Sequence, residues 1–248
     1  MSAHAGFLEI CVDSVAGARA AIAGGADAIE LCSALELGGL TPSAGLTRAV
    51  AALARPAGVT VRAMVRPRAG GFAYDRDEIC TAIEEARALL DDGIDGLVFG
   101  AVRNGRLDRA MIEAWRGGIG DPTAKLTLHR AIDVTEDPIA SIEEAIALGF
   151  DQVLTSGGAA SAWDGRETIA RMVAAADGRC RIVAGAGVRS EQVGALIEAI
   201  GCRAVHASAR SKQVGAGPKT FGFGTGSAPA DEQVVRALRR AIDAASSD

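Results

Sequence analysis

The sequence contains no apolar run that approaches the roughly 20 residues a membrane span needs. It also lacks a basic patch, and its 26 lysines and arginines are outnumbered by 31 aspartates and glutamates, which gives a net charge of −5. Membrane and nucleic-acid partners are therefore not expected. Residues 1–6 have neither the basic nor the apolar segment of a secretory signal, so we expect a cytoplasmic protein.

Cysteine is scarce as well, with five residues and no CxxC spacing. So few cysteines in a chain of 248 residues do not make a disulfide framework, and we expect reduced thiols. Cys80 falls inside an expected helix, and Cys180 and Cys202 lie at the entry ends of the expected seventh and eighth strands. We interpret these three as small buried hydrophobic residues.

What the sequence does contain is an alternation of apolar, strand-like runs and amphipathic helices along almost its whole length. The strands are expected at 7–11, 27–32, 59–65, 95–99, 125–130, 151–155, 180–184 and 203–207. Eight strand–helix pairs at a repeat of about thirty residues predict an α/β fold, a (β/α)8 TIM barrel, in one domain over 1–248. An open doubly wound sheet is the alternative, but it usually has a GxGxxG turn after its first strand, and none occurs there.

Capping residues indicate where helices begin. Ser14 precedes the first helix, and Thr41-Pro42 pairs a capping residue with proline at the first helical position of the second.

Three connections at the carboxyl ends of expected strands are longer than the short turn that joins a strand to a helix. They are 33–42, 66–75 and a Gly-rich loop at about 211–229. Barrel active sites lie at this end of the strands. The last loop is either a lid over a ligand or a plain connection or subunit contact. A Schiff-base aldolase is not expected, because Lys125 opens a strand at the opposite end and the other two lysines lie in this loop.

A Glu-x-Cys pattern occurs in both of the first two strands, as Glu9-Ile10-Cys11 and Glu30-Leu31-Cys32. Residues i and i+2 share a face of a strand, and a strand–helix–strand unit places its strands parallel and usually side by side. The sequence therefore predicts two carboxylates and two thiols on one wall of one sheet. Buried carboxylates are costly unless they are paired or functional.

Successive side chains of a strand point to opposite faces, and this strand parity places several ionisable residues in the upper interior of the expected barrel. They are Glu9, Glu30, Arg62, Arg66, His129 and His206. One interpretation is a structural network in which arginines neutralise buried carboxylates. The other is a binding cavity, because structural barrel layers are mostly branched aliphatic. The two carboxylates and two histidines are then the candidate acid–base groups of an enzyme. In that enzyme, Arg62, Arg66 and Arg68 would orient a small anionic or sugar-like substrate.

The segments that follow the seventh and eighth strands are typical of a barrel phosphate site, in which backbone N–H groups at two helix starts bind the anion. The candidate anion-binding residues here are Gly187, Arg189, Ser208 and Arg210, besides Arg66 and Arg68. The segment 155–158, after the sixth strand, offers further donors. Glycine in such segments also simply allows tight turns.

Cys11 and Cys32 suit a soft cation, and Cu(I) is the soft ion that accepts few ligands. Zinc would need four ligands, or three and a water, and could recruit a carboxylate of either strand or a histidine. Two further interpretations stay open. The cysteines are packing residues, or one is a nucleophile with His129 or His206 as its base.

A resemblance to a known family is carried by these segments, in this order: Ile10–Ser14, Gly24–Asp27, Ile29–Cys32, Gly38–Ser43, Met64–Arg68, Gly96–Gly100, His129–Asp133, Phe150–Gly158 and Val205–Ser208. They are similar to the copper-homeostasis protein CutC family, over about residues 7–210. The resemblance implies a (β/α)8 barrel in the cytoplasm, a homo-oligomer (dimer or tetramer), and a role in copper homeostasis with Cu(I) bound and no organic cofactor. The thiols implicated in some members fall on Cys11 and Cys32.

The chain departs from the family pattern in the tail at 211–229 and in two loops. The acidic residue that usually follows the Arg-Pro-Arg segment is missing, since the chain continues Ala69-Gly70-Gly71. The usual three glycines after the seventh strand are Gly185-Ala186-Gly187 here. Both departures weaken a ligand contact inferred from the family at these loops.

Overall fold

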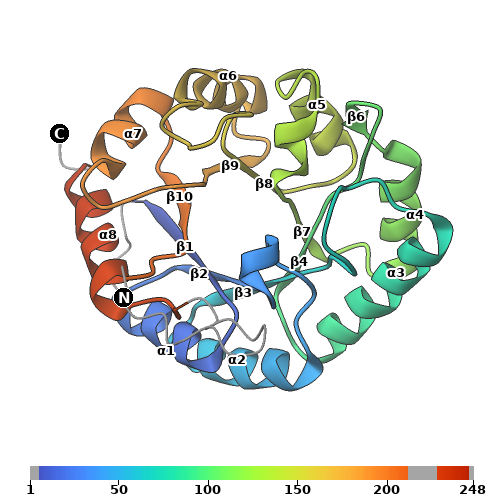
Figure 1. The fold of residues 1–248 in the computed structure, drawn as a ribbon, viewed down its shortest axis with the longest axis horizontal. Coiled ribbons are helices and arrows are strands. Elements are labelled where there is room, and N and C mark those ends of the chain that lie inside the picture. The colour runs from blue at the N-terminus through green and yellow to red at the C-terminus, as the bar shows by residue number, and fades with distance from the viewer. Residues whose placement is uncertain (1–5, 212–227, 246–248) are drawn as a thin grey trace, which may run out of the picture.

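A computed structural model describes residues 6–211 and 228–245 of the chain. In these residues eight parallel strands close into a barrel, and helices surround it on the outside (Figure 1). The strands of the barrel are β1 (Phe7–Val12), β2 (Ala28–Leu31), β3 (Thr60–Met64), β4 (Gly96–Phe99), β7 (Lys125–Leu128), β8 (Gln152–Thr155), β9 (Arg181–Ala184) and β10 (Ala204–Ala207). The predicted TIM barrel is confirmed, and each expected strand ends within two residues of an observed one.

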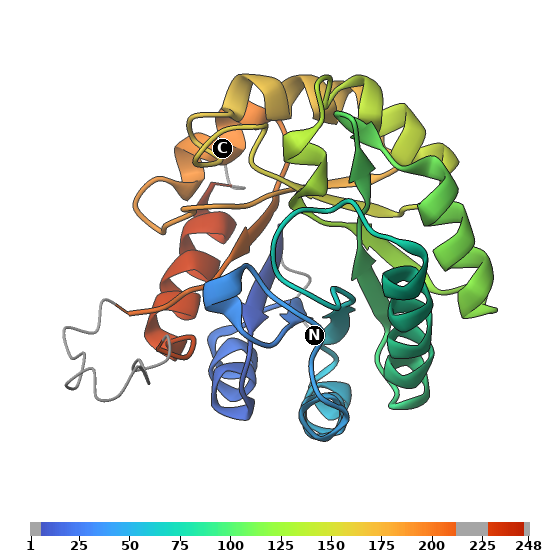
Figure 2. The same ribbon diagram turned by 45° about the vertical axis from the view of Figure 1, so that its right-hand side comes forward.

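The helices run along the outer side of the barrel, as the turned view in Figure 2 shows. They are α1 (Val15–Gly24), α2 (Ala44–Ala57), α3 (Arg76–Asp91), α4 (Arg109–Ile119), α5 (Ala140–Ala147), α6 (Arg166–Ala176), α7 (Val193–Ile200) and α8 (Glu232–Ala244), with the 3-10 helices η1 (Leu35–Leu37) and η2 (Arg130–Val134). Within the described ranges, no helix combines the length and the apolar character that a membrane crossing demands. The loop predicted at about 211–229 lies almost wholly outside the described residues.

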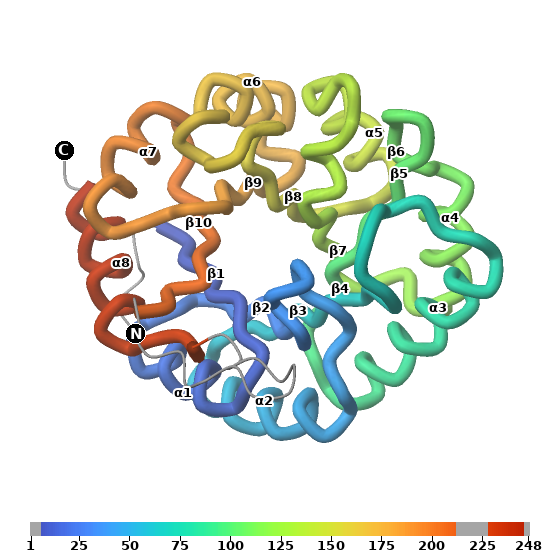
Figure 3. Tube along the Cα trace, in the orientation of Figure 1, coloured from blue at the N-terminus to red at the C-terminus, as the bar shows by residue number. Residues whose placement is uncertain are grey.

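β1 closes the barrel by pairing with β2 on one side and with β10 on the other, as the chain trace in Figure 3 shows. In this register Cys11 stands opposite Glu30, and Glu9 stands opposite His206. The two Glu-x-Cys strands are therefore neighbours, as predicted, and the last strand brings a histidine to their other side.

Side chains of β1 alternate between two environments. Leu8 and Ile10 belong to the large apolar core between the barrel and its helices. Glu9 points the other way, because its carboxylate accepts a hydrogen bond from Gln152 of β8, which is not a neighbour of β1. Such a contact crosses the barrel interior. Strand parity therefore placed Glu9 on the correct face.

One helix start differs from the expected one. Ser14 caps α1 as predicted, since its hydroxyl accepts a hydrogen bond from the Gly17 N–H. α2, however, begins at Ala44 and is capped by Ser43, so the start predicted at Thr41 is wrong. The hydroxyl of Thr41 donates to a carboxylate of α3 instead, which ties the loop after β2 to that helix.

A small ribbon after β4 was not predicted. β5 (Val102–Arg103) and β6 (Arg106–Leu107) pair antiparallel and are joined by two residues, Asn104 and Gly105. Their φ values of 51° and 72° are those of a two-residue type I′ hairpin turn. Asn-Gly is a strong sequence signal for this turn, so the ribbon was predictable.

Candidate functional site

Three ionisable side chains converge toward the carboxyl ends of β1, β2 and β10. The sulfur of Cys11, a carboxylate oxygen of Glu30 and a ring nitrogen of His206 all lie within 4.8 Å of one another, and all three residues are buried. The closure of the barrel produces this cluster, because β2 and β10 are the two neighbours of β1. A thiol, a carboxylate and an imidazole can together hold a metal ion or transfer protons.

Glu9 fixes the orientation of His206. Its Oε1 lies 2.9 Å from His206 Nδ1, and its Oε2 accepts a hydrogen bond from Gln152 Nε2 at 3.0 Å. Burial alone would raise the pKa of the Glu9 carboxyl, but the hydrogen bond and charge of His206 hold it below its usual value. Burial would likewise lower the pKa of His206, but Cys11, Glu30 and Glu9 raise it well above its usual value. We therefore assign an ionised Glu9 and a protonated His206.

Glu30 is a buried carboxyl with one unpartnered oxygen. Its Oε2 accepts a hydrogen bond from Cys32 Sγ at 3.7 Å and lies 3.8 Å from His206 Nε2. Its Oε1 is buried without a hydrogen-bond partner among the described residues. Burial raises the pKa of Glu30 to about 7, although the charge of His206 acts in the opposite direction. A carboxyl that titrates near neutrality and keeps one oxygen free is suited to binding a ligand or moving a proton.

The two thiols of the Glu-x-Cys pattern have different surroundings. Cys32 is fully buried and packs with Met64 and Val98. Burial, together with the charge of Glu30, raises the pKa of the Cys32 thiol well above its usual value. Cys11 instead lines a cavity that opens at the barrel mouth. Of the two candidate metal ligands, Cys11 is therefore the one that an incoming ligand meets first.

The remaining cysteines correct one expectation. Cys180 is buried and Cys202 is partly buried, but Cys80 is exposed, so its predicted burial is wrong. α3 buries the side that contains Ile79 and Ala82, and Cys80 lies off that side. Cys80 is therefore an exposed reference thiol against which Cys11 and Cys32 can be compared.

His129 does not join the cluster, although it was a candidate acid–base group. Its Nδ1 accepts a hydrogen bond from the Ala131 N–H at 3.1 Å, and its ring centroid lies 4.8 Å from that of Phe72. Burial and the positive charge of Arg66 lower the pKa of His129 to about 3, so its imidazole is neutral. The Nε2 atom of His129 is buried and has no hydrogen-bond partner within the described part of the chain. Of the two candidate histidines, the structure brings His206 to the cysteine.

Three arginines considered as ligand-orienting groups have internal partners. Arg62 pairs with Asp151 at 2.6 Å. Because Asp151 directly precedes β8, Arg62 reaches the amino end of the barrel and not the upper interior, where parity had placed it. Arg66 donates to three backbone carbonyls in the loops after β2 and β3. Arg68 pairs with Glu78 at the start of α3.

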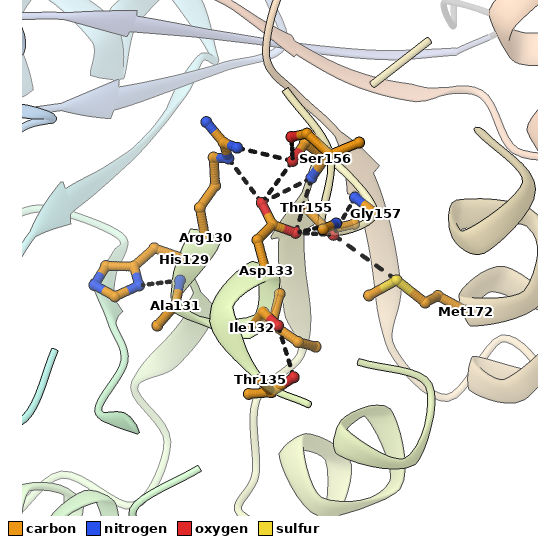
Figure 4. A network of polar contacts seen from close by, with 12 residues as sticks. His129, Arg130, Ala131, Ile132, Asp133, Thr135, Thr155, Ser156, Gly157 and Met172 are labelled. Atoms are coloured by element: carbon orange, nitrogen blue, oxygen red, sulfur yellow. Dashed lines mark hydrogen bonds and ion pairs between the residues drawn. The ribbon is translucent and has the colours of Figure 1, made fainter. Parts of the chain in front are cut away.

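A second polar network surrounds Asp133 in η2 (Figure 4). Its carboxylate accepts hydrogen bonds from the N–H groups of Ser156 and Gly158 and from the hydroxyl of Thr155. Arg130 pairs with the same carboxylate at 2.8 Å. The donors that the sequence suggested for an anion at 155–158 are thus directed at a carboxylate of the protein itself, which fixes the loop after β8.

The other anion-binding candidates meet in one place. A cavity of about 890 Å³ opens where β9 and β10 end. Four of the expected anion-binding residues line it: Gly187, Arg189, Ser208 and Arg210. Cys11 and His206 belong to the same lining, so the cavity leads from the surface to the ionisable cluster.

Comparison with known proteins assigns the chain to a family. A sequence model of the CutC family matches residues 7–211. The chain belongs to the CutC family. A CutC family protein of Agrobacterium fabrum is 44% identical over 243 residues, which cover 96% of this chain and 94% of that protein.

One solved structure agrees with this assignment, and a second shows only the fold. The CutC protein of Streptococcus agalactiae, whose name refers to copper homeostasis, is similar with a TM-score of 0.77 and 26% identity, over 82% of this chain and 98% of that one. A thiamine phosphate pyrophosphorylase of Pyrococcus furiosus covers 98% of both chains with a TM-score of 0.62 and 15% identity. The second likeness shows the common barrel fold alone. In this member of the CutC family, the cluster and the cavity lie at the barrel end where active sites usually occur.

Proposed function

We propose that this protein binds Cu(I) at the barrel mouth, as a CutC-like protein of copper homeostasis. Cys11 is the first thiolate ligand and Cys32 the second, with the imidazole of His206 as a nitrogen donor. The observation that supports the proposal is the convergence of the Cys11 sulfur, a Glu30 oxygen and a His206 nitrogen within 4.8 Å.

The donor set fits a soft ion. Cu(I) favours thiolate and also takes imidazole. Cys32 donates to the same Glu30 carboxylate that borders Cys11, so the second thiol lies at the edge of the cluster. Zinc would use Cys11, Glu30 and His206 as three ligands with water as the fourth. Binding of either ion displaces protons from the thiols and from His206, so affinity should rise with pH.

An anaerobic Cu(I) titration against a competing chelator tests this proposal. We expect wild-type protein to bind one equivalent, and we expect the Cys11→Ser, Cys32→Ser double variant to bind about 100-fold more weakly or worse, because lost ligands cost more than the 10–100-fold of outer-shell changes. Cys80→Ser is the matched control, since it removes an exposed thiol and should leave the affinity unchanged. Equal Cu(I) affinity in the double variant would contradict the proposal. Tighter binding of Zn²⁺ than of Cu(I) to the wild type in a parallel titration would reassign the ion.

A second candidate function is favoured by the pKa of Glu30. A buried carboxyl titrating at about 7 beside a protonated histidine is arranged for acid–base catalysis on a small substrate. We would incubate metal-free protein with a mixture of small metabolites and follow each by mass spectrometry. Consumption of one compound by wild type but not by Glu30→Gln would support an enzyme. Identical mixtures after both incubations would count against it.

We further propose that the protein acts in the cytoplasm as a homo-oligomer, either a dimer or a tetramer. Five unpaired cysteines suit a reducing compartment, which supports the first part. The family resemblance supports the second. Light scattering on the full chain gives the subunit number.

A further inference from the structure

The cavity at the ends of β9 and β10 is larger than a metal ion needs. Its volume of about 890 Å³ lies within the roughly 300–1,000 Å³ that small-molecule sites occupy. One wall comes from the loop after β9 and another from the segment after β10, and the first turn of α8 adds to the lining. At its inner end are Cys11 and His206. A bound molecule could therefore span from the surface to the cluster.

The lining of this cavity carries excess positive charge. Arg130, Arg189 and Arg210 contribute to it, and Glu191 is the single carboxylate among the described lining residues. Arg130 is held in position by Asp133 and by neighbouring groups of the loop after β8. The side chains of Arg189 and Arg210 make no hydrogen bond or ion pair with other residues of the described part of the chain. Within the described residues, their donors are therefore free for a ligand.

The backbone around the cavity is strained at two positions. Ala186 and Ala209 both adopt the left-handed region, with φ of 81° and 46°, and both line the cavity. This region is unfavourable for a residue with a Cβ atom, and residues held in it cluster at active sites and ligand-binding sites. The two alanines follow β9 and β10 and shape the walls that carry Arg189 and Arg210.

We propose that this cavity binds a small organic molecule that carries a phosphate group. The phosphate lies between Arg189 and Arg210, because a planar guanidinium group can donate two parallel N–H hydrogen bonds to two oxygens of one phosphate. β9 and β10 are the seventh and eighth strands of the barrel, and the loops after these strands frequently bind phosphate in TIM barrels. The remainder of the molecule extends toward Cys11 and His206. This proposal does not depend on copper binding.

Calorimetric titration of metal-free, full-length protein with inorganic phosphate tests the anion site. We expect saturable binding to wild type, weakened about tenfold or more, or 1.4 kcal/mol, in the Arg189→Ala, Arg210→Ala variant. The control is Arg19→Ala, Arg171→Ala, which removes the same charge at two exposed positions outside the cavity and should bind as wild type does. Equal weakening in both variants, or no saturable binding to wild type, would overturn the proposal.

Alkylation of Cys11 tests where the rest of the molecule lies. We expect glycerol 3-phosphate to slow the reaction of Cys11 with iodoacetamide several-fold, measured by peptide mass spectrometry, and to leave the exposed Cys80 unaffected. The Arg189→Ala, Arg210→Ala variant should lose this protection. Equal rates at Cys11 with and without the compound would overturn the placement next to the cluster. Both experiments use metal-free protein, so their outcome is independent of whether Cu(I) binds.

Discussion

Replacing Glu9 with glutamine is expected to lower the free energy of unfolding by about 3–5 kcal/mol, the usual cost of removing one partner of a buried ion pair. Glu9 is almost completely buried, and its carboxylate meets His206 at 2.9 Å and Gln152 at 3.0 Å. Glutamine keeps the shape of the side chain but removes the ionised partner at Nδ1, and it leaves the protonated histidine with Glu30 alone, a carboxyl that titrates at about 7. Chemical denaturation at neutral pH measures the difference.

Glu191→Gln is the matched control for this substitution. Glu191 is an exposed carboxylate in the lining of the same cavity, and its replacement should change stability by no more than about 0.5 kcal/mol. If Glu9→Gln were as mild as the control, His206 would not be the protonated partner that we assign. In that case His206 would already be neutral and would bind the metal without losing a proton.

Replacing Glu30 with glutamine should increase the free energy of unfolding of the metal-free protein relative to that of the wild type, and this difference should grow as pH rises. The pKa of Glu30 is about 7 in the folded protein, against 4.5 for an unperturbed glutamate, so the folded state retains a proton that the unfolded state loses. The stability linked to this proton is complete below pH 4.5 and is lost as pH rises through 7. At about 1.36 kcal/mol per pKa unit, the ionised Glu30 costs the wild type roughly 3 kcal/mol by pH 8.

Glutamine cannot ionise, so its curve of stability against pH lacks this fall. The measurement is denaturation of wild type and Glu30→Gln from pH 4.5 to pH 8, with Glu191→Gln as the control. We expect the difference between wild type and Glu30→Gln to shift by roughly 3 kcal/mol in favour of the variant, since the wild type alone loses a proton in this range. Parallel curves would show that Glu30 is already ionised at low pH, and the acid–base function would then lose its main support.

The barrel was predictable from the sequence because strand parity and strand–helix alternation are local properties. In the runs 7–11 and 27–32 large aliphatic residues occupy every second position (Leu8 and Ile10, Ile29 and Leu31), and this side of each strand packs beneath the helices. The same parity placed Glu9 inside the barrel. The prediction that the two Glu-x-Cys strands are neighbours followed from the rule that a strand–helix–strand unit places its strands parallel and usually side by side. The contact with His206 depends on closure of the barrel, which brings the eighth strand beside the first.

The features that escaped prediction depend on where long side chains reach. Parity placed Arg62 in the upper interior. Its side chain does reach Thr127 across the barrel, but its length let it turn to Asp151 at the amino end. His129 and His206 have the same parity, yet their strands lie on different parts of the barrel, and only closure decides which one meets Cys11. The position of the start of α2 depended on whether Thr41 or Ser43 found an N–H partner.

X-ray absorption of the protein loaded anaerobically with one equivalent of Cu(I) tests the proposed copper site most directly. We predict two sulfur scatterers and a nitrogen scatterer around the copper, and we predict loss of one of the two sulfur scatterers in Cys11→Ser but of neither in Cys80→Ser. A spectrum that is unchanged in Cys11→Ser would contradict the copper site at the barrel mouth. The cluster of Cys11, Glu30 and His206 would then be the reacting end of the phosphate-binding cavity alone.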